Sequence, residues 1–128
     1  MKINVLIVDD SAAIRKILVR MLSQTDLPWG DVQEAGDGAE ALNVLKGFHA
    51  SLIFSDIYMP NMDGLQFLTQ VRADSKWKQI PVIMISTEGH QAKVLEAVQL
   101  GANGYVRKPF TADQIKEKVL SCIKSAAA

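Results

Sequence analysis

Short apolar runs alternate with amphipathic segments along the whole chain, which is the pattern of an α/β domain. The predicted strands cover residues 3–8, 31–35, 52–55, 81–85 and 104–106. The first run is almost continuously apolar, as expected for a parallel strand buried on both faces, whereas the second is more polar and is typical of an edge strand. The pattern therefore predicts a doubly wound parallel sheet of five strands.

Each predicted strand is followed by a segment whose apolar residues have helical spacing. The predicted helices run from after Ser11 to before Pro28, over residues 37–45, 64–72 and 88–100, and onward from Thr111. Ser11, Asp63 and Thr111 are expected to cap their helices. In the first helix, the expected inward stripe is Ile14, Ile17, Leu18, Met21 and Leu22. Two tryptophans lie in loops. Trp29 is expected to make a satellite hydrophobic contact, with packing on the surface near its loop as the alternative, and Trp77 is expected to be a partly exposed loop anchor.

Polar side chains follow the predicted strands at the points where they end. Asp9 and Asp10 follow the first strand, Asp56 the third and Ser86 the fourth, and Lys108 lies just beyond the fifth. The carboxyl ends of parallel strands meet at one edge of the sheet, where open α/β proteins bind their ligands. We therefore expect three carboxylates, a hydroxyl and a lysine to converge there.

Taken singly, an acid such as Asp9 or Asp63 is explained by helix capping, and Asp56 by the end of a strand. Taken together, three carboxylates in a small site repel one another unless a cation neutralises them. Mg²⁺ accepts such oxygen ligands and bridges to phosphate, although an acid cluster alone does not separate it from Ca²⁺ or Mn²⁺. No His/Cys cluster supports zinc, because His49 and His90 are far from these acids in sequence and are expected at the surface.

Length and charge restrict the possible classes of function. The 128 residues suit one domain spanning residues 1–128, with no linker and no output domain. Lys and Arg total 14, as do Asp and Glu, so no basic field favours direct binding of nucleic acid. A single cysteine, Cys122, suits a reducing compartment, and no apolar run approaches the roughly 18 residues needed to span a membrane. A cytoplasmic protein without membrane insertion is expected.

Four segments together resemble the receiver domain of two-component response regulators, over nearly the whole chain. They are VDDS at 8–11, SDIYMPNMDG at 55–64, IST at 85–87 and GYVRKPF at 104–110. The expected absence of an output domain makes the chain similar to the stand-alone, chemotaxis-type (CheY-like) regulators. The resemblance implies a flavodoxin-like sheet of strand order 2-1-3-4-5 with five helices.

The resemblance also implies a phosphoryl site. Asp56 would accept a phosphoryl group from a histidine kinase or phosphotransfer protein. Asp10, Asp56 and the backbone carbonyl of Tyr58 would bind Mg²⁺ directly, and Asp9 would act through a water molecule. Such a protein is not a conventional enzyme, since it catalyses only its own phosphorylation and dephosphorylation.

The remaining implied roles concern switching. Lys108 would pair with the phosphoryl group across a cis Lys108–Pro109 bond, Ser86 would move to hydrogen-bond the group, and Tyr105 would turn inward. Affinity for a downstream protein would then change at the face formed by the fourth helix, fifth strand and last helix. Tyr58 and Glu88 would flank the path of an attacking water and tune the lifetime of the phosphoryl group.

Three other interpretations fit parts of the sequence. A flavodoxin-like FMN carrier shares the fold, but Asp9 and Asp10 would repel its phosphate. A phosphatase of the haloacid dehalogenase type also uses an aspartate nucleophile, but needs a second Asp where Tyr58 stands. A phosphorylation-independent binding module does not require the charge arrangement of Asp9, Asp56 and Lys108. The sequence does not identify the kinase or the downstream target.

Overall fold

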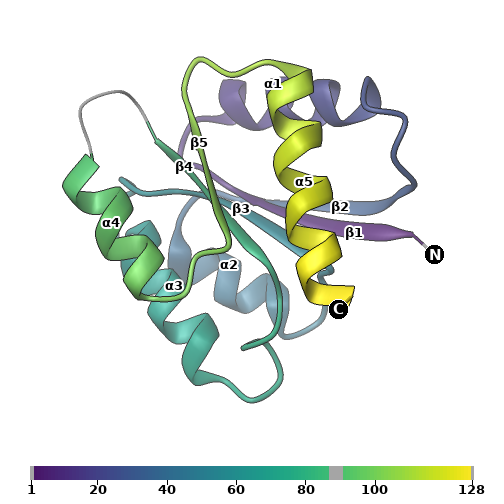
Figure 1. The fold of residues 1–128 in the computed structure, drawn as a ribbon. Helices are drawn as coiled ribbons and strands as arrows, with labels where there is room; N and C mark the ends of the chain where they lie inside the picture. The colour runs from purple at the N-terminus through teal and green to yellow at the C-terminus, as the bar shows by residue number, and fades with distance from the viewer. Residues whose placement is uncertain (1, 87–90, 128) are drawn as a thin grey trace.

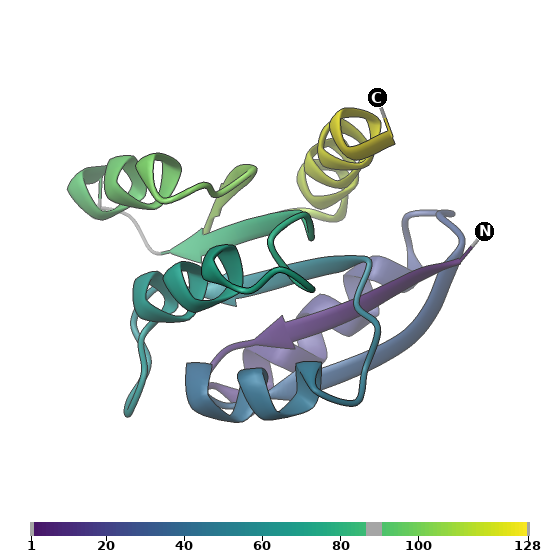
Figure 2. The same cartoon turned by 90° about the horizontal axis from the view of Figure 1, so that it is seen from below.

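The chain folds into one parallel β-sheet between two layers of helices (Figures 1 and 2). A computed structural model describes the backbone of residues 2–86 and 91–127 and the side chains of these residues up to position 123. The strand order is β2-β1-β3-β4-β5, and every neighbouring pair is parallel. The predicted flavodoxin-like order 2-1-3-4-5 is confirmed.

Strands and helices alternate strictly along the chain. The strands are β1 (Ile3–Val8), β2 (Trp29–Ala35), β3 (Leu52–Asp56), β4 (Val82–Ser86) and β5 (Gly104–Arg107). The helices are α1 (Ala12–Ser23), α2 (Gly38–Leu45), α3 (Gly64–Ala73), α4 (Gln91–Gln99) and α5 (Ala112–Ala127). In the part of the chain that the structure describes, no helix is both long and apolar enough to cross a bilayer.

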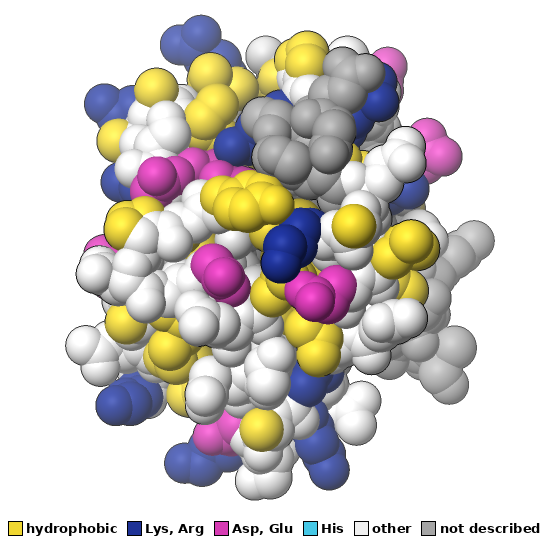
Figure 3. Space-filling model, turned by 90° about the vertical axis from the view of Figure 1, so that its left-hand side faces the viewer, with side chains coloured by type: hydrophobic (Ala, Val, Ile, Leu, Met, Phe, Trp, Pro, Cys, Tyr) yellow, Lys and Arg dark blue, Asp and Glu magenta, His cyan; other side chains and the backbone are white. Residues whose placement is uncertain are grey.

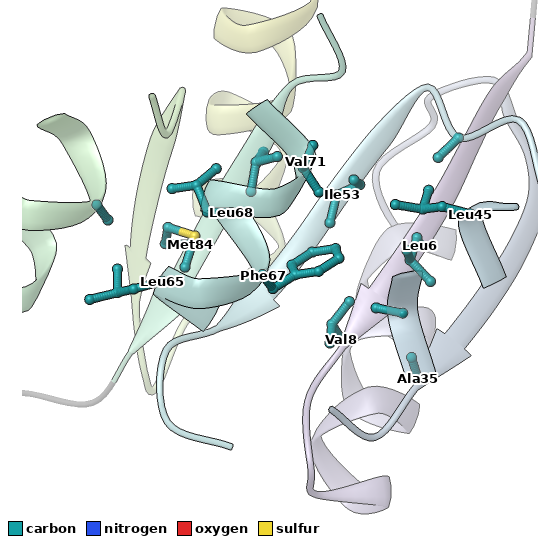
Figure 4. Close-up of a cluster of buried hydrophobic side chains, with 14 of the residues drawn as sticks. Leu6, Val8, Ala35, Leu45, Ile53, Leu65, Phe67, Leu68, Val71 and Met84 are labelled. Atoms are coloured by element: carbon teal, nitrogen blue, oxygen red, sulfur yellow. The ribbon is translucent and has the colours of Figure 1, made fainter. Parts of the chain in front are cut away.

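The sheet is buried on both faces, so successive residues of its central strands enter two separate cores. Ile53 belongs to the core beneath α2, α3 and α4, where Phe67 is fully buried (Figure 4). The next residue, Phe54, belongs to the core beneath α1 and α5. Burying a side chain of this size contributes about 2–3 kcal/mol, so the two cores hold the central strands rigidly.

Some details of the predicted elements differ from the structure. Ile17 was expected in the inward stripe of α1 but is 44% exposed, since Leu18 and Leu22 fill the contact with the sheet. Strand β2 begins at Trp29, two residues earlier than predicted, because Trp29 pairs with Ile3. Trp29 makes the expected hydrophobic contact, since it is half-buried against the core beneath α1 and α5, and its indole N–H donates to Thr25 Oγ1 at 2.9 Å.

The expected caps are present and fix where the helices begin. Ser11 Oγ accepts from Ile14 N at 3.2 Å. Asp63 forms a capping box with Gln66, and Thr111 exchanges the equivalent pair of bonds with Gln114. Thr87, Glu88 and His90, with the predicted beginning of the fourth helix, lie outside the described residues.

Candidate functional site

Three acids converge at the carboxyl ends of β1 and β3, as the sequence predicts. Asp9 and Asp10 follow the last residue of β1, and Asp56 is the last residue of β3. One carboxylate oxygen from each lies within 4.8 Å of the other two. Figure 3 faces this end of the molecule and shows acidic side chains beside a basic one, with hydrophobic side chains between them.

The Asp9 carboxylate is completely buried and already engaged. Its Oδ1 accepts from Ser11 N at 2.9 Å, and its Oδ2 lies 3.1 Å from Lys108 Nζ. The guanidinium of Arg15 donates to the Asp9 main-chain oxygen at 2.6 Å and pairs with Glu34 of β2 at 2.8 Å. The turn after β1 is thus stabilised by contacts to both the side chain and the main chain of Asp9. Sequence analysis missed this role of Arg15.

Asp10 differs from Asp9 in being exposed. Among the described residues, none forms a hydrogen bond or an ion pair with the Asp10 carboxylate. Its oxygens are therefore open to solvent and to an incoming ion.

Asp56 is a buried carboxylate whose negative charge is disfavoured by its surroundings. Its Oδ1 accepts from Ile57 N at 2.8 Å, and its Oδ2 lies 3.4 Å from Lys108 Nζ. Burial, and then the charge of Asp9, raise the pKa of Asp56 above its usual value, and they outweigh the opposing effect of Lys108. One lysine is therefore insufficient to neutralise the cluster.

Lys108 reaches the acids from the segment after β5. Its backbone N–H donates to Ser86 O at 2.7 Å, which joins this segment to the end of β4. The expected cis peptide bond to Pro109 is present. Burial lowers the pKa of Lys108, but attraction to Asp56 and Asp9 outweighs burial, so the net pKa is raised and the ammonium stays charged.

Ser86 lies on β4, the strand next to β3, and Tyr105 lies on β5, the edge strand beyond it. Ser86 ends β4 and is buried, one position beyond Ile85, which is paired with Asp56 across the sheet. Tyr105 pairs with Met84 and is half-buried against the core beneath α2, α3 and α4. Ser86 is therefore close to Asp56 at the end of the neighbouring strand, whereas Tyr105 lies one strand farther away.

A model of one protein family matches most of this chain. The model of the response regulator receiver domain matches residues 5–120. The chain belongs to this family. It is a CheY-like response regulator of two-component signalling and not a conventional enzyme.

Chemotaxis proteins are among its relatives. It is 42% identical to chemotaxis protein CheY-3 of Vibrio cholerae over 116 residues, covering 91% of this chain and 88% of that protein. Chemotaxis response regulator CheY4 of Vibrio cholerae has a TM-score of 0.79 and 33% identity, covering 98% of this chain and 99% of CheY4. NtrX from Brucella abortus has a TM-score of 0.88 and 27% identity over 99% of this receiver domain, but the receiver spans only 28% of the NtrX chain.

The loop after β3 in this receiver brings α3 against the main chain of Asp56. A Cβ atom on Gly64 would overlap the main-chain oxygen of Asp56 and lie 2.9 Å from Ile57 Cα. Gly64 N donates to Ile57 O at 2.7 Å, and Asn61 Nδ2 donates to Asp37 Oδ2 at 2.8 Å. Sequence analysis treated Gly64 only as the start of a helix. The Asp-Gly pair at 63–64 was the available signal for this close approach.

The donor set of the receiver fits Mg²⁺. Oxygens bound to one Mg²⁺ at about 2.1 Å are at most about 4.2 Å apart, and a separation within 4.8 Å is close to this span. Only oxygen donors are present, and the exposure of Asp10 leaves room for the waters that Mg²⁺ keeps. Asp10, Asp56 and the backbone carbonyl of Tyr58, two residues beyond Asp56, are the groups that would hold the ion.

Proposed function

We propose that Asp56 accepts a phosphoryl group from a phosphohistidine on a histidine kinase or phosphotransfer protein, in a reaction that requires Mg²⁺. The phosphorylated protein then changes its affinity for a downstream protein at the surface formed by α4, β5 and α5. The proposed location is the cytoplasm, where Cys122 stays reduced.

The observation that carries this proposal is the under-neutralised acid cluster. Asp9, Asp10 and Asp56 bring three acidic groups together, and within the described residues Lys108 is the one cation that pairs with them. Such a cluster stores unfavourable electrostatic energy, which a divalent cation relieves. Helix capping alone gives no reason to bury Asp56 beside Asp9.

In the transfer step, a carboxylate oxygen of Asp56 attacks the phosphorus of the phosphohistidine. An O–P bond forms as the N–P bond breaks, and the N–P electron pair remains on the imidazole, which takes up a proton. The Lys108 ammonium lies 3.4 Å from Asp56 Oδ2 and is placed to attract the incoming phosphoryl oxygens. When bound, Mg²⁺ offsets the negative charge of the transferred group. Asp9 fixes the lysine through its 3.1 Å contact.

The response to phosphorylation follows from Lys108 and Ser86. A dianionic group on Asp56 attracts Lys108 away from Asp9 and gives the Ser86 hydroxyl a new acceptor. The main chains of Lys108 and Ser86 are hydrogen-bonded, so the end of β4 and the segment after β5 respond together. Tyr105, on β5, is the residue expected to turn inward.

Exposed apolar side chains support protein binding at the proposed surface. On α4, Leu95 is 65% exposed and Val98 is 55% exposed, although both are large hydrophobic residues. Tyr105, Arg107 and Lys118 line a hollow of about 170 Å³ between β5 and α5. A partner with apolar and acidic side chains fits this combination.

The proposal is tested by phosphorylation with acetyl phosphate, read by intact mass with Mg²⁺ or with a chelator. We expect one phosphoryl group per chain with Mg²⁺ and none with the chelator. Asp56→Asn should abolish the modification, whereas Asp31→Asn, an exposed site on β2, should leave it unchanged. No modification of the wild type, or equal modification of Asp56→Asn, would contradict the proposal.

A second experiment separates phosphorylation from switching. We expect Lys108→Ala to accept the phosphoryl group but to lose the accompanying changes in the backbone amide resonances of β5 and α5. Lys16→Ala, at an exposed position on α1, keeps the ammonium at the acids and serves as the control. Wild-type resonance changes in phosphorylated Lys108→Ala would show that the lysine does not transmit the signal.

A further inference from the structure

A hollow of about 600 Å³ lies at the opposite end of the sheet from the acids. Its walls are residues 45–51, which lead from α2 into β3, and residues 76, 77 and 79–81, which lead from the end of α3 into β4. This volume is in the range of small-molecule sites, which is about 300–1,000 Å³. No role in the proposed phosphorylation uses this end of the molecule.

The hollow has an excess of positive charge, although the whole chain is neutral. Lys46 and Lys76 line it, together with His49, and no Asp or Glu does. Neither lysine ammonium pairs with an acid among the residues whose side chains the structure describes. The C-terminus of α2 carries only about half a negative charge, which two lysines exceed. Asp74 lines an adjoining hollow, which shares Lys46 and Trp77 with this one, and its Oδ1 accepts from Lys76 N at 2.8 Å.

Aromatic side chains line the same hollow. Trp77 and Phe48 are both half-buried and packed against the core beneath α2, α3 and α4, so their positions are fixed without a ligand. Ser51 Oγ, also in the lining, accepts from Asn4 N at 3.2 Å and keeps its hydroxyl hydrogen for another acceptor. The hollow therefore offers an aromatic surface on which a planar ring of a ligand can stack. It also offers hydrogen-bond donors for an anionic group of the same ligand.

We infer that this hollow is a binding site for a small phosphorylated aromatic ligand of the nucleotide class. The ring of the ligand packs against Trp77, and its phosphate lies between Lys46 and Lys76, which come from different walls of the hollow. This inference is independent of the proposed phosphorylation, because the site is at the other end of the sheet.

The two tryptophan indoles make the inference testable by NMR. Adenosine 5′-monophosphate is titrated into the ¹⁵N-labelled protein, with the indole resonances assigned from Trp29→Phe. We expect the Trp77 resonance to shift saturably and the Trp29 resonance, whose N–H is held by Thr25, to stay unchanged. Adenosine and inorganic phosphate, titrated separately, should each bind on the order of tenfold more weakly, because each lacks one of the two interactions.

The lysines are tested with the double variant Lys46→Ala/Lys76→Ala. Both residues are exposed, so the fold should be preserved, and affinity for adenosine 5′-monophosphate should fall on the order of tenfold. Lys16→Ala removes an exposed positive charge from α1, which does not line the hollow, and should leave affinity for adenosine 5′-monophosphate unchanged. The inference is overturned by the absence of a saturable Trp77 shift up to about 10 mM ligand, or by unaltered affinity in the double variant.

Discussion

Replacing Asp56 by asparagine should stabilise the fold at neutral pH when no divalent cation is present. Asparagine has nearly the same shape, and its Oδ1 can still accept the hydrogen bond from Ile57 N. The substitution removes one of the three charges at the carboxyl ends of β1 and β3. Its effect on stability therefore reports the electrostatic burden of the site.

The magnitude follows from the distances around Asp56. At an effective dielectric constant of about 20, attraction to Lys108 at 3.4 Å is worth about 5 kcal/mol, and repulsion by Asp9 within 4.8 Å at least about 3.5 kcal/mol. Asp10 is exposed and adds a smaller repulsion. Because these opposing terms are similar, the burial of the Asp56 carboxylate, whose side chain is 11% exposed, decides the sign. We expect Asp56→Asn to gain about 1–2 kcal/mol, or roughly 3–8 °C in Tm.

The dependence on pH has a defined direction. The pKa of Asp56 is raised in the folded protein, so the folded state binds this proton more tightly than the unfolded chain does. The advantage of Asp56→Asn should therefore be small below the ordinary aspartate pKa of about 3.9. It should grow as the pH rises through the raised value.

The assay is urea unfolding followed by circular dichroism, with a chelator or with Mg²⁺. Mg²⁺ should stabilise the wild type and shrink the difference, because a ligand that binds only the folded state adds to its stability. Asp31→Asn is the matched control and should change little. The reasoning is refuted if Asp56→Asn is less stable than the wild type with chelator at pH 7, or if its advantage does not shrink in acid.

Three other substitutions or reactions test particular contacts. Gly64→Ala should cost about 2 kcal/mol or more in urea unfolding and slow the phosphorylation of Asp56, since the added methyl displaces its main chain; normal values for both would contradict the close approach. Asp37→Ala should cost about 1 kcal/mol as a lost helix cap. That cost should fade as the pH drops through the pKa of Asp37, which its bonds to Glu40 and Asn61 lower, whereas a constant cost from pH 7 to pH 2 would exclude the carboxylate as the cap. Burial raises the pKa of the Cys122 thiol, so it should react with a disulfide reagent only through transient opening, and rapid reaction in the native protein would contradict its burial.

The alternation of apolar runs with amphipathic segments predicted the parallel sheet. It also predicted that the acids meet at the carboxyl ends of the strands. Asp9 and Asp56 each stand directly at the end of a buried strand, and parallel pairing then leaves little freedom in where they lie. The caps at Ser11 and Asp63 were equally local, because a capping bond joins residues three apart. Features set by neighbours in sequence were therefore predictable.

Contacts between distant segments were not predictable from the pattern. Arg15 supports the turn after β1 by donating to the Asp9 main-chain oxygen. Its guanidinium also pairs with Glu34, which lies on β2, a different strand. Ile17 has the spacing of a core residue, yet the helix contact is already filled, so it remains exposed. The charged hollow at Lys46 and Lys76 joins two loops that are 30 residues apart along the chain.

The most direct test of the central claim is to locate the phosphoryl group. The protein is treated with acetyl phosphate and Mg²⁺, reduced with borohydride, which converts an aspartyl phosphate to homoserine, and digested for peptide mass spectrometry. We predict that homoserine appears at Asp56, and that it is lost when Mg²⁺ is chelated. Modification at Asp9, Asp10 or another residue in place of Asp56, or modification that persists with the chelator, would contradict the account.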